Sequence, residues 1–466
     1  MHFLAALFLL SFVVYGPGAT SISGPPPLEI TGSWLGTLSI PGGQLRIVFN
    51  ITRTEGGGLT ATLDSPDQGA TGIPTTSVTF QGDSLRIEVG TIQGVYEGRA
   101  ESEDRIVGTW TQAGSTFPLD LERVKDTTAT QLPERPQEPK PPFPYESEDL
   151  QFESAEAGVR LAGTLTLPAG AGPFPAVILV SGSGPQDRDE TIFGHKPFLV
   201  IADHLTRQGI AVLRYDDRGV GGSTGDLSLA TIENFVQDAR GALQYLQNRA
   251  EVDQDRIGIL GHSEGALVAP RVANLTDDVA FLVLLAPPGV PGDELLLEQS
   301  TLLMRTAGAP GEAIEANRSA QKRIFEVVRQ VPVAAQADSI RSILATSGIP
   351  QEAAEAQIRQ ITSPWFRHFI TYDPRPALDS LDIPVLALFG EKDLQVPAAQ
   401  NAPIIETALN AGDDSQATVH VLPGLNHLFQ TATTGDVSEY ARIEETIDPG
   451  VLDLISSWIT STMANR

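Results

Sequence analysis

The spacing of hydrophobic residues changes along this chain, and the change predicts two different domains. Residues 28–123 contain short runs in which apolar and polar residues alternate, such as LRIVFNI and SLRIEV, separated by Gly-rich turns. A period of two is typical of half-buried strands, so this region predicts a small all-β domain, either a barrel or a sandwich. Residues 124–146 follow, and their many prolines predict an extended, semi-rigid linker.

Residues 147–466 show a different pattern, in which continuous apolar runs alternate with helix-like stretches. The runs PAVILV, GIAVLRY, AFLVLLA and PVLALFG have the composition of parallel strands that are buried on both faces. Strands that alternate with helices predict an α/β domain with helices on both faces of its sheet.

The alternation is interrupted at about residues 291–373, which are helical in pattern and rich in Ala, Glu, Gln and Arg. An insertion at this point of an α/β domain is expected to cover the active-site edge of the sheet as a helical cap. Its aromatic residues Trp365, Phe366 and Phe369 have two interpretations. They line an acyl-binding pocket, or they pack the cap against the body of the domain.

The pentapeptide GHSEG, residues 261–265, lies between the apolar run RIGIL and the helix-like stretch ALVAPRVA. Strand, sharp turn and helix form the context in which G-x-S-x-G exposes a nucleophilic serine. This context makes Ser263 the candidate nucleophile. A second match, GGSTG at residues 221–225, lies in a Gly-rich loop several residues after a strand, and we interpret its Ser223 as a loop residue.

A serine nucleophile needs a base, and in this context the base is a histidine that follows the serine along the chain. The histidines after Ser263 are His368, His420 and His427. His427 comes in a loop after the strand-like TVHVL, which is where a catalytic imidazole is expected. His420 lies inside that strand, and His368 lies in a helical part of the insertion, so His427 is the predicted base.

The acid that orients the base is expected after the buried strand PVLALFG. Asp393 lies just beyond the carboxyl end of this strand, where open α/β sheets place their chemistry. Glu391 is the alternative, and either carboxylate has the second interpretation of a turn or cap residue.

Hydrolysis of an acyl compound also needs two backbone N–H groups directed at the oxyanion. One is expected from Glu264, directly after the nucleophile. The loop SGSGPQDRDE, residues 181–190, is expected to supply the other, and Ser183 is the candidate. The alternative for this loop is an ordinary Gly-rich turn between a strand and a helix.

Together these segments resemble the α/β-hydrolase superfamily, and within it the bacterial serine esterases that carry a β-rich domain in front. The resemblance rests on SGSGPQDRDE, YDDRGVGGSTG, GHSEG, GEKDLQVP and NHLFQ, which occur in this order. It implies that Ser263, Asp393 and His427 form the catalytic triad. It also implies that Asp217 and Arg218 support the active-site loops. Ser181 departs from the wider superfamily, in which a His-Gly pair is common.

Composition limits the remaining possibilities. The chain has 466 residues and a formal net charge of −27, which makes nucleic acid an unfavourable partner. It contains no cysteine, so disulfides, thiolate chemistry and cysteine-based metal sites are excluded. The sequence shows no spacing typical of a catalytic metal site and no nucleotide-binding fingerprint, so no metal or cofactor is expected.

The first residues have the pattern of an export signal. Residues 3–15 form an apolar run that is short for a membrane span, and small residues follow it. Residues 1–20 are therefore predicted to be a secretory signal peptide, which gives a secreted or periplasmic protein without a stable membrane span. The alternative is an uncleaved N-terminal anchor.

These predictions combine into one function. The chain is expected to be a secreted serine hydrolase of small carboxylic esters, with a preference for short acyl chains, acting through an acyl-enzyme on Ser263. A peptidase or amidase with the same triad, a long-chain lipase or thioesterase, and a non-catalytic binding protein are the alternatives. The sequence leaves the natural substrate and the oligomeric state open.

Overall fold

A computed structural model describes most of the chain. The described residues are 29–40, 43–68, 70–112, 115–125, 133–346, 351–410 and 416–464. The predicted signal peptide, residues 1–20, lies outside these ranges. The described residues divide into two compact units. One contains those within 135–337 and 359–464, and the other contains those within 29–134 and 338–358. We call them the hydrolase unit and the β unit.

The strands of the β unit form one antiparallel sheet within the described residues. They are β1 (Gly32–Ile40), β2 (Gly43–Arg53), β3 (Leu59–Ser65), β4 (Ala70–Pro74), β5 (Ser77–Gln81), β6 (Ser84–Val89), β7 (Gly94–Ser102), β8 (Arg105–Gln112), β9 (Ser115–Pro118) and β10 (Leu121–Arg123). Their order is β4-β3-β2-β1-β10-β8-β7-β6-β5, and β9 pairs with β8. Because β3 also contacts β5, the sheet curls into a partly open barrel.

The core of the β unit is filled by aromatic side chains from alternate strand positions. Trp34, Phe49, Tyr96 and Trp110 are all fully buried. The ring of Phe49 lies 5.5 Å from that of Tyr96 and 6.1 Å from that of Trp110. Burial alternates along β3 and β6, as the period of two in the sequence predicts.

The hydrolase unit is built on an eight-stranded, mostly parallel sheet. Its strands are β11 (Glu146–Glu153), β12 (Arg160–Leu167), β13 (Phe174–Val180), β14 (Ala211–Tyr215), β15 (Val252–His262), β16 (Phe281–Leu285), β17 (Val385–Gly390) and β18 (Ala417–Leu422). They lie in the order β11-β12-β14-β13-β15-β16-β17-β18. The strands from β14 to β18 are parallel, whereas β11 and β12 are antiparallel to their neighbours. This is the strand order of the α/β-hydrolase fold, so the predicted fold class is confirmed.

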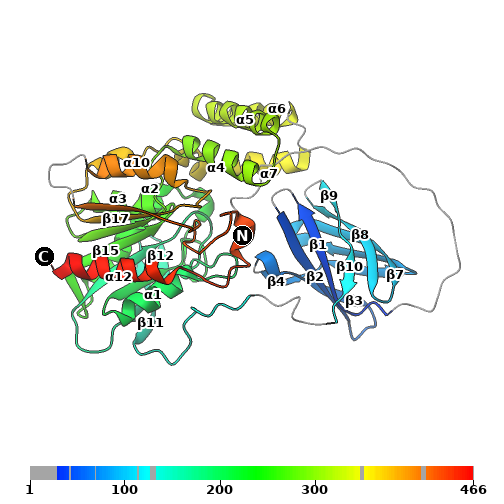
Figure 1. Ribbon diagram of the computed structural model, residues 1–466, viewed down its shortest axis with the longest axis horizontal. Helices are drawn as coiled ribbons and strands as arrows, with labels where there is room; N and C mark the ends of the chain where they lie inside the picture. Colours follow the sequence, from blue (N-terminus) through cyan, green and yellow to red (C-terminus); the bar gives the residue numbers. More distant parts are fainter. Residues whose placement is uncertain are drawn as a thin grey trace. The chain divides into compact units, whose positions relative to one another are not determined.

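Helices cover both faces of this sheet. Those outside the insertion are α1 (Pro197–Arg207), α2 (Ile232–Gln247), α3 (Gly265–Ala273), α9 (Arg375–Asp379), α10 (Ala398–Leu409), α11 (Val437–Tyr440) and α12 (Pro449–Ala464). Figure 1 shows α1 and α12 on one face and α2, α3 and α10 on the other. Among the helices of the described residues, none is both long enough and apolar enough to cross a membrane.

The interruption predicted at residues 291–373 contains helices between β16 and β17. They are α4 (Gly292–Thr306), α5 (Gly311–Gln330), α6 (Val333–Thr346), α7 (Gln351–Ile361) and α8 (Pro364–Phe369). In α8, Phe366 and Phe369 are buried, and the ring of Phe366 lies 6.1 Å from that of Phe325. These two phenylalanines therefore pack the insertion.

The proline-rich stretch predicted as a linker, residues 124–146, ends where β11 begins. Residues 126–132 of it lie outside the described residues. Beyond them, Arg135 binds the hydrolase unit, because its guanidinium donates hydrogen bonds to the carbonyls of Phe193, Gly194, Ala441 and Ile443. The end of this stretch, from residue 135 on, thus belongs to the hydrolase unit and is held there by hydrogen bonds from the Arg135 side chain to backbone carbonyls.

Candidate active site

Ser263 occupies a sharp turn between β15 and α3. Its φ of 52° lies in the left-handed region, which costs a non-glycine residue free energy and marks a strained position. The turn has no room for a side chain two residues before or two residues after the serine. A Cβ on Gly261 would overlap the carbonyl of Gly265, and a Cβ on Gly265 would overlap the carbonyl of Val180. The glycines of GHSEG are therefore required by close backbone approach.

Asp393 and His427 form a buried pair at the same edge of the sheet. Asp393 follows β17, and its Oδ2 lies 2.7 Å from Nδ1 of His427. Its other oxygen, Oδ1, accepts hydrogen bonds from the amides of Gln395 and Val396 at 2.7 Å and 2.9 Å. These bonds fix the carboxylate, and the carboxylate in turn fixes the imidazole, which is 5% exposed.

Ser263 lies beside this pair without a hydrogen bond to it. In the part of the chain that the structure describes, no hydrogen bond joins the Ser263 hydroxyl to His427. The two loops meet through His262, whose Nε2 lies 3.1 Å from the carbonyl oxygen of His427 and whose ring centroid lies 4.8 Å from the His427 ring. Contacts of a catalytic base commonly tighten only when substrate binds. The complete triad therefore stays a prediction.

The alternative residues for the acid and the base lie elsewhere. Glu391 is turned to the amide of Gly424, from which it accepts a hydrogen bond of 2.8 Å. His420 is exposed on β18. His368 lies in α8, with its Nε2 3.8 Å from a carboxylate oxygen of Glu233. None of the three contacts the Asp393–His427 pair.

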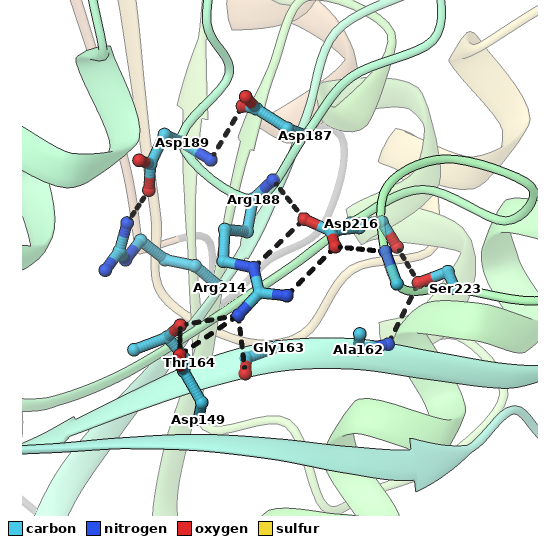
Figure 2. A network of polar contacts seen from close by, with 11 residues as sticks. Asp149, Ala162, Gly163, Thr164, Asp187, Arg188, Asp189, Arg214, Asp216 and Ser223 are labelled. Atoms are coloured by element: carbon cyan, nitrogen blue, oxygen red, sulfur yellow. Dashed lines mark hydrogen bonds and ion pairs between the residues drawn. The ribbon is translucent and has the colours of Figure 1, made fainter.

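Ser223, from the second G-x-S-x-G match, is engaged with backbone. Figure 2 shows its hydroxyl between Asp216 and Ala162. The hydroxyl donates to the Asp216 carbonyl at 2.7 Å and accepts from the Ala162 amide at 2.9 Å. A hydroxyl that donates and accepts in this way joins the loop to β12.

The two backbone amides predicted to bind the oxyanion have no internal partner. Among the described residues, no hydrogen bond uses the amide of Ser183 or that of Glu264. The neighbouring amide of Gly182 differs, because it donates to Glu190 Oε1 at 2.7 Å. A Cβ on Gly182 would lie 3.3 Å from Cβ of Ser263, so this loop passes directly over the strained serine. The assignment of Ser183 and Glu264 stays a prediction.

Buried charges hold the loop after β13 against the loop after β14. Arg188 makes paired bonds to Asp216, from Nε at 3.0 Å and Nη2 at 2.9 Å (Figure 2). Asp217 accepts hydrogen bonds from the Ser181 hydroxyl at 2.9 Å and from the Gln186 amide at 3.0 Å. Burial raises the pKa of Asp217 well above its usual range, although these bonds oppose the shift. The supporting role that the resemblance implies for Asp217 agrees with these contacts.

Two buried features of the site were not predicted from the sequence. One is the carboxylate of Glu264, to which the indole of Trp365 donates a hydrogen bond. Burial raises the pKa of Glu264 to about 7, and the indole N–H partly offsets this effect. The other is a contact between the Glu190 carboxylate and His262, the variable residue before the serine in GHSEG, with Oε1 2.9 Å from Nδ1. Each of these two contacts joins residues that are far apart in the chain. The only signal for them in the sequence was the presence of acidic residues near the motifs.

The described ranges contain no group of three or more His, Cys, Asp or Glu residues arranged to hold a metal ion.

Comparison with known proteins agrees with this arrangement. A family described as serine aminopeptidase, S33, matches residues 196–431, which is about half of the chain and includes Ser263, Asp393 and His427. The chain belongs to this family. It is therefore an α/β hydrolase, and the resemblance found from its motifs is confirmed.

Individual relatives of this hydrolase include esterases. Esterase EstD of Thermotoga maritima is 28% identical over 309 residues, which cover 66% of this chain and 68% of the relative. Among solved structures, the α/β hydrolase GrgF from Penicillium sp. sh18 is 18% identical, with a TM-score of 0.43 over 68% of this chain and 99% of that one. The Pyrococcus furiosus esterase Pf2001 is 16% identical, with a TM-score of 0.40 over 69% of this chain and 90% of that one.

Proposed function

We propose that this hydrolase cleaves carboxylic esters with Ser263 as its nucleophile. The observation that carries the proposal is the position of Ser263 on a strained turn, at the same sheet edge as the buried Asp393–His427 pair. A strained serine between β15 and α3 presents its hydroxyl above the sheet. The similarity to an esterase from Thermotoga maritima supports the ester as the bond that is cleaved.

The reaction follows from the roles that this geometry supports. His427 takes the proton of the Ser263 hydroxyl as its oxygen attacks the ester carbonyl. Asp393 holds His427 with Nδ1 protonated, so that Nε2 is the basic nitrogen, and stabilises the imidazolium that forms. The amides of Ser183 and Glu264 stabilise the oxyanion. His427 then protonates the leaving alcohol, and water attacks the acyl-enzyme with the same base.

The preference for short acyl chains and the export of the protein belong to the same proposal. Trp365 of the insertion reaches Glu264, directly after the nucleophile, which supports a restricted acyl site. The apolar run at residues 3–15 supports a secretory signal and a secreted or periplasmic location. Intact-mass measurement of the exported protein tests the second point, because retention of Met1 would contradict a cleaved signal.

An aminopeptidase is the second candidate, because the family to which the chain belongs is described as serine aminopeptidase. Ester and amide hydrolysis use the same serine chemistry, so the site does not separate them. In an aminopeptidase, the free amino group of the substrate would need a carboxylate close to the nucleophile. Glu264 is a buried carboxylate at that position, and it is already bound to Trp365.

The deciding experiment compares two substrate panels on the purified full-length protein. One panel contains 4-nitrophenyl esters from acetate to palmitate, and the other contains aminoacyl 4-nitroanilides with free amino groups. We expect kcat/KM to be highest for short esters and to be lost in Ser263→Ala. A higher kcat/KM on the anilides would favour the aminopeptidase. Ester turnover that survives Ser263→Ala would overturn the assignment of the nucleophile.

A further inference from the structure

A buried contact between the Glu190 carboxylate and the His262 imidazole, next to Ser263, has no role in the reaction proposed above. Glu190 Oε1 lies 2.9 Å from Nδ1 of His262 and accepts a hydrogen bond of 2.7 Å from the amide of Gly182. Glu190 is 2% exposed and His262 is 6% exposed. Burial of two ionisable side chains costs desolvation free energy, so their presence beside the nucleophile calls for a physical explanation.

The second nitrogen of His262 faces an oxygen that can only accept. Its Nε2 lies 3.1 Å from the carbonyl oxygen of His427, so this nitrogen carries a hydrogen. Nδ1 faces the Glu190 oxygen that already accepts from Gly182. Each ring nitrogen of His262 therefore faces an acceptor, the Glu190 carboxylate at Nδ1 and the His427 carbonyl at Nε2. Two such acceptors form the environment of a doubly protonated imidazolium.

This arrangement connects the loops that carry the proposed catalytic groups. Gly182 precedes Ser183 in the loop after β13, His262 precedes Ser263, and the bonded carbonyl belongs to His427 itself. A Cβ on Gly182 would lie 3.2 Å from Glu190 Oε1 and 3.5 Å from Nδ1 of His262. The three segments are therefore in direct contact around one imidazole ring.

We propose that His262 is a positioning residue for the hydrolase reaction. Through Glu190, its ring connects the loop after β13, which carries the predicted oxyanion amide, to the backbone of His427. The proposal rests on the proposed function of Ser263 and His427. Loss of either hydrogen bond would let the oxyanion amide or the basic imidazole move relative to the serine. A displacement of about 1 Å in such a site costs on the order of 100-fold in rate.

The charges around His262 give this role a dependence on pH. Burial opposes a charge on the ring, but the Glu190 carboxylate, the His427 carbonyl and the Asp393 carboxylate favour it, and together they raise the pKa of His262 above its usual value. As the pH rises through this pKa, the ring loses a proton and can keep only one of its two donated bonds. We therefore expect kcat to decline reversibly on the alkaline side.

The test compares His262→Gln and Glu190→Gln with the full-length wild type, and uses His420→Gln as the control, because His420 is exposed on β18. Ester hydrolysis is measured from pH 5 to 10, together with thermal unfolding and labelling by a fluorophosphonate. We expect both network variants to remain folded and labelled at Ser263, with kcat lower by on the order of 10- to 100-fold and a much smaller change in KM. His262→Gln should also lose the alkaline decline, and the control should match wild type.

A spectroscopic measurement keeps this test independent of activity. In protein labelled with ¹⁵N-histidine, the ring nitrogens of His262 should both show the shifts of an imidazolium at pH 7, and these signals should be absent from His262→Gln. A neutral His262 ring, or a His262→Gln variant with wild-type kcat and an unchanged pH profile, would overturn the proposal. Absence of Ser263-dependent ester turnover in the wild type would instead refute the proposed function, whatever the protonation of His262.

Discussion

Trp365 donates its indole N–H to the buried carboxylate of Glu264, across 101 positions of the chain. Glu264 directly follows Ser263, whereas Trp365 belongs to α8 of the insertion between β16 and β17. The indole ring also stacks on Phe369, with centroids 5.0 Å apart. Trp365 is therefore both a packing residue and a polar contact to the turn that carries the nucleophile.

The raised pKa of Glu264 predicts a pH-dependent effect on stability. Burial raises this pKa from 4.5 to about 7, so the folded state favours the protonated carboxyl. Its contribution to stability is fully present below pH 4.5 and is lost as the pH rises through about 7. Glu264→Gln keeps an oxygen that accepts from Trp365 but does not ionise. We expect the variant to be more stable than wild type at pH 8, by up to roughly 3 kcal/mol, in urea unfolding.

Trp365→Phe is the matched control for this prediction. It keeps a ring to stack on Phe369 but removes the N–H donor, which helps the Glu264 carboxylate to ionise. The loss of stability with rising pH should therefore begin at the same pH as in wild type, which the unfolded state sets, but should continue to a higher pH and become larger in total. If the difference in the free energy of unfolding between wild type and Glu264→Gln is the same at pH 4.5 and pH 8, the pKa of the buried Glu264 carboxyl is not raised.

The Arg218–Asp238 pair predicts a stability effect away from the reacting atoms. Arg218 makes two bonds of 2.8 Å to Asp238, and both side chains are almost fully buried. Asp238→Ala leaves the buried Arg218 cation with Glu156, a partly exposed residue, as its remaining carboxylate partner, so the cost should not exceed the about 3–5 kcal/mol of a buried charge with no partner. Urea unfolding followed by the helical circular-dichroism signal measures it, because most helices belong to the hydrolase unit.

The double variant Arg218→Met with Asp238→Leu shows whether this cost comes from the unpaired charge. Replacing both partners with apolar side chains removes the uncompensated charge, so the double variant should be more stable than Asp238→Ala alone. If the loss of unfolding free energy in the double variant equals the sum of the losses in the two single variants, the two side chains act independently.

Sequence patterns predicted the elements that depend on local order. Continuous apolar runs predicted the buried parallel strands. Because parallel strands end at a common edge, the positions shortly after β15, β17 and β18 made Ser263, Asp393 and His427 the candidate site residues. The contacts of Asp393 and His427 could therefore be anticipated without coordinates. Residues 32–123 could be predicted as all-β, but not as one curled sheet, because alternation does not specify which strands pair.

Contacts between distant segments were beyond the reach of the sequence. Glu190 and His262 are separated by 72 positions, and neither lies at a spacing that predicts a contact. His262 was only the variable residue of the G-x-S-x-G pattern. The bond between Trp365 and Glu264 depends on how the insertion folds back, which hydrophobic periodicity does not determine. Burial of ionisable groups follows from such packing and cannot be derived from residue identities.

The two G-x-S-x-G serines should respond differently to removal of their hydroxyls. Ser263→Ala should lower kcat by several orders of magnitude, because only binding and oxyanion stabilisation remain. Ser223→Ala loses one bond to Asp216 and one to Ala162, so its cost should be confined to loop stability. A fluorophosphonate should label wild type and Ser223→Ala, but not Ser263→Ala. Labelling that persists in Ser263→Ala would make another residue the nucleophile.

Asp393→Asn separates the orienting role of the carboxylate from its role in the fold. The Asn oxygen can still accept from the amides of Gln395 and Val396, as Oδ1 does now. The side-chain NH₂ would then face Nδ1 of His427 and donate to it, which forces the hydrogen onto Nε2. An imidazole in that tautomer cannot accept the Ser263 proton, so kcat should fall by about 10⁴-fold while the melting temperature changes little.

Glu391→Gln is the control for this prediction, because Glu391 lies two residues away and its carboxylate binds only the Gly424 amide among the described residues. A glutamine oxygen can keep that bond, so kcat should stay within a few-fold of wild type. Steady-state kinetics on a short ester and thermal unfolding, measured on both variants, decide the matter. If Asp393→Asn keeps kcat within tenfold of wild type, or if Glu391→Gln shows the larger loss, Asp393 is not the residue that orients His427 for catalysis.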